Sequence, residues 1–381
     1  MDNIVYFDNA ATTFPKPECV YTAMDHFARS CGVSIGRGQH PLSSRASFIA
    51  DETRELLQQL FHSTNKKVVF TNTATEALNI IIRGINISKG VNVYISPFEH
   101  NAVTRTLHYL QKQNDFQIIQ LACDKDTYRI DVEGVEKQFK ENKPFCVIIS
   151  HVSNVLGAVA PIEKIFSASK KYGAITIADM CQSAGLIDTD IASSDFDYVV
   201  FAGHKTLYGP LGISGFITAF PQELPPLIIG GTGFDSAKQD MPDDIPVKYE
   251  AGSHNSTAIA GLNASLKWLI DLGIENVYKT EMKHYDRLQA LLGSYDNITQ
   301  YLPENGIGVV SCNFEGYSSS EIGQVISQKI AIRSGLHCAP LAHKFIGTFP
   351  GGTVRFSVSY FNNDRDFEAL EEMLDYIADN S

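Results

Sequence analysis

The sequence lacks an excess of basic residues and a long apolar run. Its 381 residues include 31 Lys and Arg against 43 Asp and Glu, which gives a formal net charge of −12. A chain without basic excess is poorly suited to bind a nucleic-acid backbone. Apolar runs such as 147–149 are far too short to span a bilayer. We therefore expect neither a nucleic-acid partner nor a membrane protein.

The sequence also lacks the features of a secreted or metal-bound protein. The first residues, MDNIVYFDNAATTF, have no basic segment followed by an apolar stretch, so they do not resemble a signal peptide. The seven cysteines include no CxxC pair, which argues against a disulfide framework or a zinc site. We expect a cytoplasmic, metal-free protein in a reducing environment.

Short apolar runs rich in β-branched residues alternate with helical patterns over the first two-thirds of the chain. This pattern is typical of an α/β fold with a mainly parallel sheet that is covered on both faces. The helical patterns cover 43–62, 131–141 and 162–172. The seven predicted strands are 68–71, 91–96, 117–121, 146–150, 174–178, 198–202 and 215–219.

The pattern changes after about residue 221. Turn-rich stretches at 230–233 and 240–246 predict an irregular excursion. A long helix from residue 256, strands at 308–314 and 353–359, and a terminal helix predict a smaller α+β unit. We expect a large domain at 15–249 and a small domain formed by 1–14 and 250–381, since one core rarely serves so long a chain.

Three polar features follow predicted strands, where open α/β sheets bind ligands. Residues 71–76 (TNTATE) precede a helix and could cradle a phosphate, although an ordinary helix cap is the favoured interpretation when they are taken alone. Asp179 ends a strand, with Gln182 three residues later, and could hold a heteroaromatic nitrogen protonated or simply be a buried, bonded carboxylate. Lys205 lies in a glycine-flanked turn, where partial desolvation would make it an amine nucleophile; a solvated loop lysine is the alternative.

Together these three features match the needs of pyridoxal 5'-phosphate (PLP), namely a lysine, an acid and a phosphate cradle. At these residues the chain resembles the class V aminotransferase-fold enzymes, and among them the second group of cysteine desulfurases. The matching segments occur in order along nearly the whole chain: 6–13 (YFDNAATT), 73–79 (TATEALN), 99–102 (EHNA), 151–157 (HVSNVLG), 178–185 (ADMCQSAG), 202–210 (AGHKTLYGP), 250–257 (EAGSHNST) and 354–362 (VRFSVSYFN).

The resemblance implies the fold-type I architecture and a role for each matching residue. Lys205 would be the Schiff-base lysine and Asp179 the partner of the ring nitrogen. His100 would stack on the ring, unless it only caps a helix. The remaining implied contacts are Gln182 and Asn154 near the ring oxygen and substrate, Ala74, Thr75 and His204 at the phosphate, Ser253 at the phosphate of a partner subunit, and Arg355, Arg37, Arg333 and Asn154 at the substrate.

Cys338 distinguishes between the reactions that this fold can host. It lies in 331–340 (AIRSGLHCAP), where a thiolate beside the imidazole of His337, which can carry a positive charge, could act as a nucleophile. The segment is similar to the R-x-G-x-H-C-A motif of the desulfurases. That similarity implies that L-cysteine is converted to alanine, with its sulfur left as a persulfide on Cys338. It also implies a homodimer and a sulfur-acceptor protein, for example in iron–sulfur cluster assembly or tRNA modification.

Several alternatives stay open. Selenocysteine lyases and cysteine-sulfinate desulfinases share almost all of these motifs, and Ala202, Leu336 and Gly36 depart from the usual pattern. A class V aminotransferase would leave Cys338 without a role. A non-catalytic scaffold or sulfur-relay partner is a further alternative. The other cysteines are expected to be structural, as small buried residues at positions 19, 31, 123, 146 and 312 and at a helix start at 181.

Overall fold

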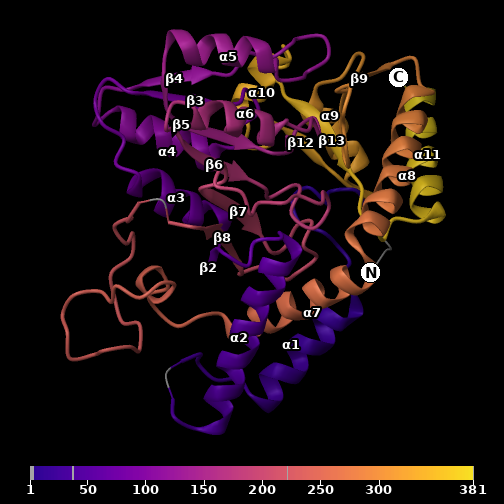
Figure 1. Ribbon diagram of the computed structural model, residues 1–381. Coiled ribbons are helices and arrows are strands. Elements are labelled where there is room, and N and C mark those ends of the chain that lie inside the picture. Colours follow the sequence, from indigo (N-terminus) through magenta and orange to yellow (C-terminus); the bar gives the residue numbers. More distant parts are fainter. Residues whose placement is uncertain (1–3, 37, 221, 381) are drawn as a thin grey trace.

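The computed structural model describes residues 4–36, 38–220 and 222–380, and a seven-stranded sheet forms its centre (Figure 1). The strand order is β2-β8-β7-β6-β5-β3-β4, and β8 runs opposite to the other strands of this sheet. The predicted α/β fold with a mainly parallel seven-stranded sheet is confirmed. The strands are β2 (Lys67–Thr71), β3 (Asn92–Ile95), β4 (Gln117–Gln120), β5 (Pro144–Ser150), β6 (Ile175–Asp179), β7 (Tyr198–Ala202) and β8 (Ser214–Thr218).

Both faces of this sheet are apolar, which explains why its strands have nearly continuous apolar sequences. Side chains of a strand alternate between the faces. Accordingly, Val147 and Ile149 of β5 join the core on one face, while Cys146 and Ile148 join the core on the other. Burial on both sides is what a parallel sheet requires.

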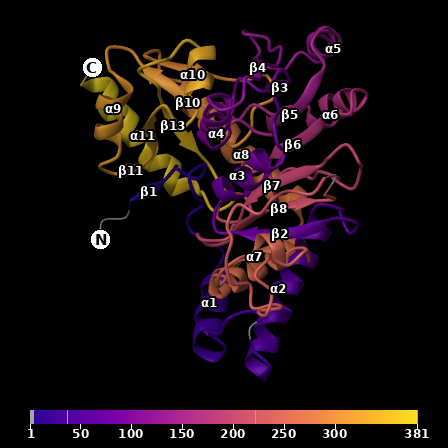
Figure 2. The same ribbon diagram turned by 90° about the vertical axis from the view of Figure 1, so that its left-hand side faces the viewer.

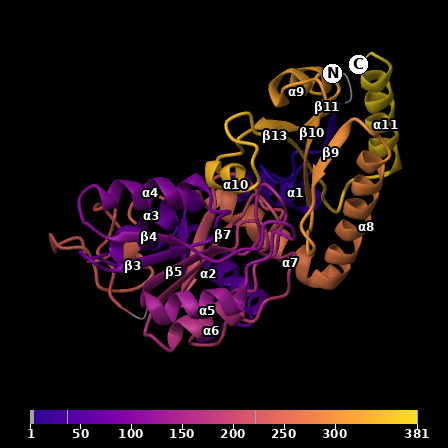
Figure 3. The ribbon, with the colours of Figure 1, turned by 90° about the horizontal axis from the view of Figure 1, so that it is seen from above.

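Helices cover the two faces as separate layers. Figure 3 shows α3 and α4 on one side of the sheet and α5 and α6 on the other. Helix α7 packs against α1 and α2, and its buried residues belong to the same core as α5 and α6. The helices are α1 (Glu18–Ser30), α2 (Pro41–Leu60), α3 (Ala74–Gly84), α4 (Asn101–Gln111), α5 (Val132–Glu141), α6 (Ile162–Lys170) and α7 (Ser256–Leu272).

The C-terminal part forms a second unit beside the large sheet (Figure 2). Its antiparallel sheet has the order β12-β13-β10-β9 and shares a core with α8, α9 and α11. The N-terminal strand β1 (Val5–Tyr6) pairs with β11 (Ile330–Ala331) of this unit. The other elements are α8 (Ile274–Gly293), β9 (Ile298–Tyr301), β10 (Val309–Phe314), α9 (Ser319–Ile326), β12 (Arg333–Gly335), α10 (Pro340–Phe345), β13 (Thr353–Ser357) and α11 (Asp364–Asp379).

The division into domains at 1–14, 15–249 and 250–381 stays a prediction. The pairing of β1 with β11 favours it, whereas the packing of α7 favours assigning that helix to the large unit. Between β8 and the short 3-10 helix Val247–Tyr249, the described residues contain no helix or strand, as the turn-rich sequence predicts. Among the helices of the described chain, none combines the length and apolarity needed to cross a bilayer.

Candidate active site

A cavity of about 290 Å³ opens at the carboxyl ends of β5, β6 and β7 and at the starts of α3 and α4. This is the edge at which open α/β sheets bind ligands. Most of the predicted site residues line it, although they are spread over almost the whole chain. They are Ala74, Thr75, His100, Asn154, Asp179, Gln182, His204, Lys205, Arg333 and Arg355.

Lys205 and Asp179 are brought together because the strands that precede them are neighbours. The turn after β7 is tight: a Cβ on Gly203 would lie 2.6 Å from the carbonyl oxygen of Ile213, so only glycine fits there. Asp179 ends β6, and one of its carboxylate oxygens accepts the backbone N–H of Cys181 at 3.0 Å. The cavity therefore contains a primary amine and a partly bonded carboxylate.

One end of the cavity offers hydrogen-bond donors and a helix start. Thr73 caps α3 by accepting the N–H of Glu76 at 3.1 Å, and Thr75 follows in the first turn. The buried Nδ1 atom of His204 has no partner among the described residues. Burial, and then the charge of Lys205, lower the pKa of His204 to about 3. A neutral imidazole and free N–H groups suit an anion such as phosphate.

His100 is both a helix cap and a cavity wall. Its Nδ1 atom accepts the N–H of Ala102 at 3.0 Å at the start of α4. Burial, followed by the charge of Lys205, lowers the pKa of His100 to about 4, so the ring is neutral. The capping role is therefore confirmed, and the same side chain also lines the cavity.

Arg355 is a buried cation in the cavity wall. Its side chain is only 1% exposed. It donates from Nη2 to Asp8 at 2.6 Å and from Nη1 to the carbonyl of Asn154 at 2.9 Å. The buried Nε atom has no partner in the described part of the chain. An unused, desolvated donor on a guanidinium suits a carboxylate ligand.

Cys338 lies at a second cavity rather than in the first. The second cavity, of about 790 Å³, is lined by Cys338, whereas Arg333 and His337 line both cavities. Arg333 donates from Nη2 to the sulfur of Cys338 at 3.3 Å. His337 and Cys338 both have left-handed backbone conformations, with φ of 47° and 59°. Such conformations cost free energy and are found mostly where a site requires them.

The expectation that His337 supplies a positive charge to the thiolate is wrong. His337 is buried, and burial together with the charge of Arg355 lowers the pKa of its imidazole well below the usual value. Its Nε2 lies 3.1 Å from the carbonyl oxygen of Thr353, which can only accept, so Nε2 carries the proton. The cation in contact with Cys338 is Arg333.

Besides Cys338, two other predicted site residues are absent from the described lining of the Lys205 cavity. Ser253 is exposed and lines a small separate cavity with Asn72 and Glu76. Arg37 lies outside the described residues. Among the other cysteines, burial is confirmed at positions 31, 146 and 312, but it is wrong for Cys19, which is exposed, and for Cys123, which is half-buried. Cys181 is buried, but it lies in a turn and not at the helix start that we expected.

Sequence reasoning missed the buried carboxylate of Glu99 behind the cavity. Glu99 accepts from the hydroxyls of Ser96 and Ser150 and from the N–H of Ser150. Burial raises its pKa to about 7. Its place before His100, in the segment EHNA, was the available signal. These hydrogen bonds hold Ser150 in place, and Ser150 lines the cavity.

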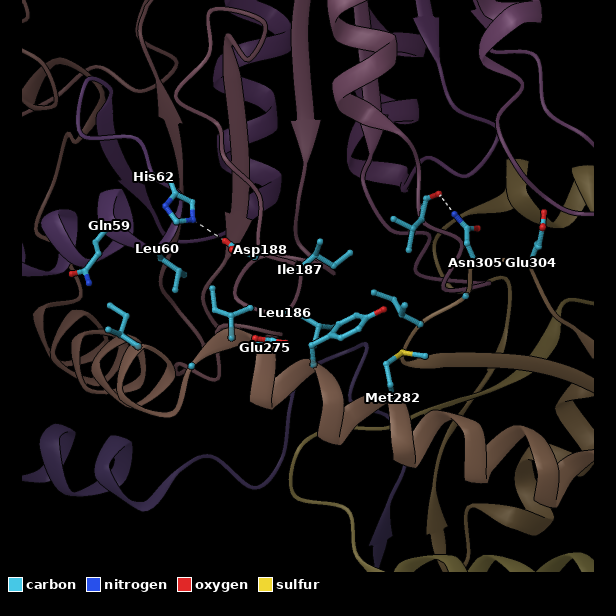
Figure 4. Close-up of a pocket in the computed structure, with 17 residues that line it drawn as sticks. Gln59, Leu60, His62, Leu186, Ile187, Asp188, Glu275, Met282, Glu304 and Asn305 are labelled. Carbon is cyan, nitrogen blue, oxygen red and sulfur yellow. Dashed lines mark hydrogen bonds and ion pairs between the residues drawn. The ribbon is translucent and has the colours of Figure 1, made fainter.

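A larger cavity, of about 1110 Å³, lies between α2, residues 186–188, the start of α8 and residues 304–307 (Figure 4). His62 and Asp188 face each other in it at 2.8 Å. It contains none of the predicted site residues. Within the described ranges, no group of three or more His, Cys, Asp or Glu side chains could hold a metal ion.

Comparison with known proteins agrees with this geometry. The family described as Aminotransferase class-V matches residues 5–370. A probable cysteine desulfurase of Methanothermobacter thermautotrophicus is 31% identical over 98% of this chain and 94% of its own length. A cysteine desulfurase of Shigella sonnei is 31% identical over 88% of this chain and 84% of its own.

Solved structures give the same result. An apo cysteine desulfurase from Thermococcus onnurineus NA1 superposes with a TM-score of 0.90 at 28% identity, covering 99% of this chain and 95% of that one. The chain belongs to the class V aminotransferase family and, within it, to the cysteine desulfurases. The family resemblance of the motifs is thereby confirmed.

Proposed function

We propose that the protein is a PLP-dependent cysteine desulfurase that converts L-cysteine to L-alanine and receives the sulfur on Cys338. One observation carries the proposal: Cys338, in contact with Arg333, follows directly on residues that line the Lys205 cavity. A thiol at that boundary can reach a ligand in one cavity and be approached from the other. The names of the relatives support the same reaction.

The residues of the first cavity fit PLP. Lys205 would hold it covalently and Asp179 would pair with its ring nitrogen, while His100 would lie against the ring. The start of α3 with Thr75 and the unpartnered His204 would hold its phosphate. When bound, PLP supplies an electron sink for carbanions at the substrate Cα.

The protein's own groups perform the remaining steps. The free Nε of Arg355 would bind the substrate carboxylate, which sets the orientation of the amino acid. Lys205 would take the proton of the substrate Cα and return it later. The thiolate of Cys338 would then attack the substrate sulfur. The Sγ–S bond forms, the substrate C–S bond breaks, and its electron pair stays with the carbon that becomes the alanine methyl group.

We infer a homodimer as the working unit. Large apolar side chains are exposed on α2 and in the excursion that follows β8, including Leu42, Phe48, Ile229 and Phe234. Exposed apolar groups of this size favour a protein interface. The exposed Ser253 would contact the cofactor phosphate of the partner. Seven free cysteines favour a reducing compartment, and we propose the cytoplasm.

The proposal is tested with two variants and a substrate panel. Lys205→Ala should lose the visible absorbance that the wild type shows with PLP, whereas Cys338→Ala should keep it and release no sulfide from L-cysteine. A colourless wild-type protein would exclude the cofactor, and sulfide release by Cys338→Ala would exclude the nucleophile. Alanine formation from cysteine, selenocysteine and cysteine sulfinate, with and without an amino-group acceptor, separates the alternative activities.

A further inference from the structure

The cavity beside Cys338 differs in chemistry from the Lys205 cavity. It is formed by α4, by residues of β3 and β4, and by the segment from Arg333 to Lys344. Apolar walls come from Ile118, Leu336 and Leu341. Its volume of about 790 Å³ is within the range of small-molecule sites, about 300–1,000 Å³.

All charged side chains that line this cavity are basic. They are Arg105 on α4, Arg333 on β12 and Lys344 on α10, and no carboxylate is among the lining residues. None of the three has a carboxylate within ion-pair distance in the described parts of the chain. In a protein with a net charge of −12, three cations that line one cavity without a carboxylate partner favour an anionic ligand.

We propose that this cavity binds a small thiol that carries carboxylate groups, and that this thiol accepts the sulfur from Cys338. The inference rests on the proposed function, because it requires a persulfide on Cys338. Arg105 and Lys344 would recognise the carboxylates, and the apolar walls would contact the carbon skeleton. The concave shape, with cations on two different helices, favours a small molecule over an extended protein surface.

The transfer step balances without an added oxidant. The acceptor thiolate attacks the outer sulfur of the Cys338 persulfide, so a new S–S bond forms as the bond from Sγ to the outer sulfur breaks. The electron pair of the broken bond stays on Sγ. Arg333, 3.3 Å from Sγ, stabilises the thiolate that leaves. The acceptor departs as a persulfide and Cys338 is ready for another turnover.

The experiment loads the persulfide chemically, so that it does not depend on turnover of L-cysteine. A Cys19→Ser protein is used, because Cys19 is exposed and would compete for the loading reagent with the half-buried Cys338. The Cys338 peptide is followed by mass spectrometry as it loses one sulfur to either mercaptosuccinate or 2-mercaptoethanol, with rates compared per thiolate. We expect mercaptosuccinate to react about tenfold faster at low salt. The preference should nearly vanish at about 1 M salt, where charges are screened.

Matched variants assign the preference to the cavity. Arg105→Gln combined with Lys344→Gln should reduce the ratio of the two rates to near that in high salt. Lys137→Gln combined with Lys140→Gln makes the same change in net charge on α5, away from the cavity lining, and should leave the ratio unchanged. Equal loss of preference in both double variants would overturn the inference, since the effect would then come from overall charge.

Two other outcomes also overturn it. One is a wild type without preference between the two thiols at low salt. The other is a thiol-containing acidic peptide that reacts fast while small thiols show no charge preference, which would assign the surface to a protein acceptor. Alanine formation from L-cysteine is measured in parallel. If no alanine forms but mercaptosuccinate is still preferred, the proposed function is contradicted and this inference is not. If alanine forms but mercaptosuccinate is not preferred, this inference is contradicted and the proposed function is not.

Discussion

Replacing Asp8 with Asn should lower the free energy of unfolding by about 3 kcal/mol, because it leaves the buried guanidinium of Arg355 without a counter-charge. The Arg355 side chain is 1% exposed and its Nη2 lies 2.6 Å from a carboxylate oxygen of Asp8. Two unit charges about 4 Å apart attract by about 4 kcal/mol at an effective dielectric constant of about 20. Measured losses from breaking buried pairs are about 3–5 kcal/mol, and the Asn amide recovers part of the hydrogen bonding.

Urea unfolding provides the measurement, followed by circular dichroism and by the fluorescence of Trp268, the only tryptophan. Its ring lies 5.1 Å from that of Tyr208, in the turn after Lys205, so it reports on the site region. Asp25→Asn is the control, since it makes the same chemical change in a pair whose members are both largely exposed. We expect the control to cost less than about 1 kcal/mol. If Asp8→Asn lowers the free energy of unfolding as little as the control does, then Arg355 is not a desolvated charge that depends on Asp8.

Two further predictions concern positions outside the reaction itself. Burial raises the pKa of Glu281 to about 7, and this carboxyl is hydrogen-bonded to the hydroxyl of Tyr208. The stability that protonation of Glu281 contributes is complete below about pH 4.5 and is lost as the pH rises through about 7. Glu281→Gln should therefore reduce the change in unfolding free energy between pH 5 and 8 by up to about 3 kcal/mol. An unchanged pH profile in this variant would contradict the prediction. Gly157 has φ of 71°, and an added Cβ would lie 2.3 Å from the carbonyl oxygen of Ile307. Gly157→Ala should therefore cost more than about 3 kcal/mol in thermal or urea unfolding, whereas Gly173→Ala, with φ of 72° and open space around it, should cost about 1 kcal/mol. Equal losses in the two variants would show that backbone strain, and not the contact with Ile307, determines the loss of stability.

Much of the fold follows from the sequence because a doubly covered strand leaves a continuous apolar run. All seven predicted strands overlap the strands β2 to β8, and the helical patterns predicted at 43–62, 131–141 and 162–172 overlap α2, α5 and α6. The pairing order does not follow, since periodicity records which face a side chain takes and not which strand lies beside it. The reversed direction of β8 could not be predicted for the same reason. Helix α1 was not predicted either, since most of its side chains are exposed and only Val20 and Phe27 are buried.

The site is predictable for a related reason: its residues follow strands, and the ends of parallel strands meet. Lys205, Asp179 and Thr75 could therefore be placed together without a structure. The electrostatics of the site could not be predicted from the sequence. His337 reads as a cation beside a thiol, but its burial, which depends on how β13 packs over it, makes the imidazole neutral. Arg333 lies five residues from Cys338 in sequence, and only the turn between them brings its guanidinium to the sulfur.

The backbone of His337 and Cys338 is hydrogen-bonded to residues of both cavities. Two consecutive left-handed residues without glycine cost about 1–3 kcal/mol each, so other contacts must hold them. The amide of Asn154, in the Lys205 cavity, donates to the carbonyl of His337 at 2.7 Å. The N–H of Asn101, which lines the second cavity, donates to the carbonyl of Cys338 at 2.6 Å. The backbone that carries the thiol is thus held by one hydrogen bond from each cavity. The position of the sulfur therefore depends on residues of both cavities, since Asn154 lines the first and Asn101 the second.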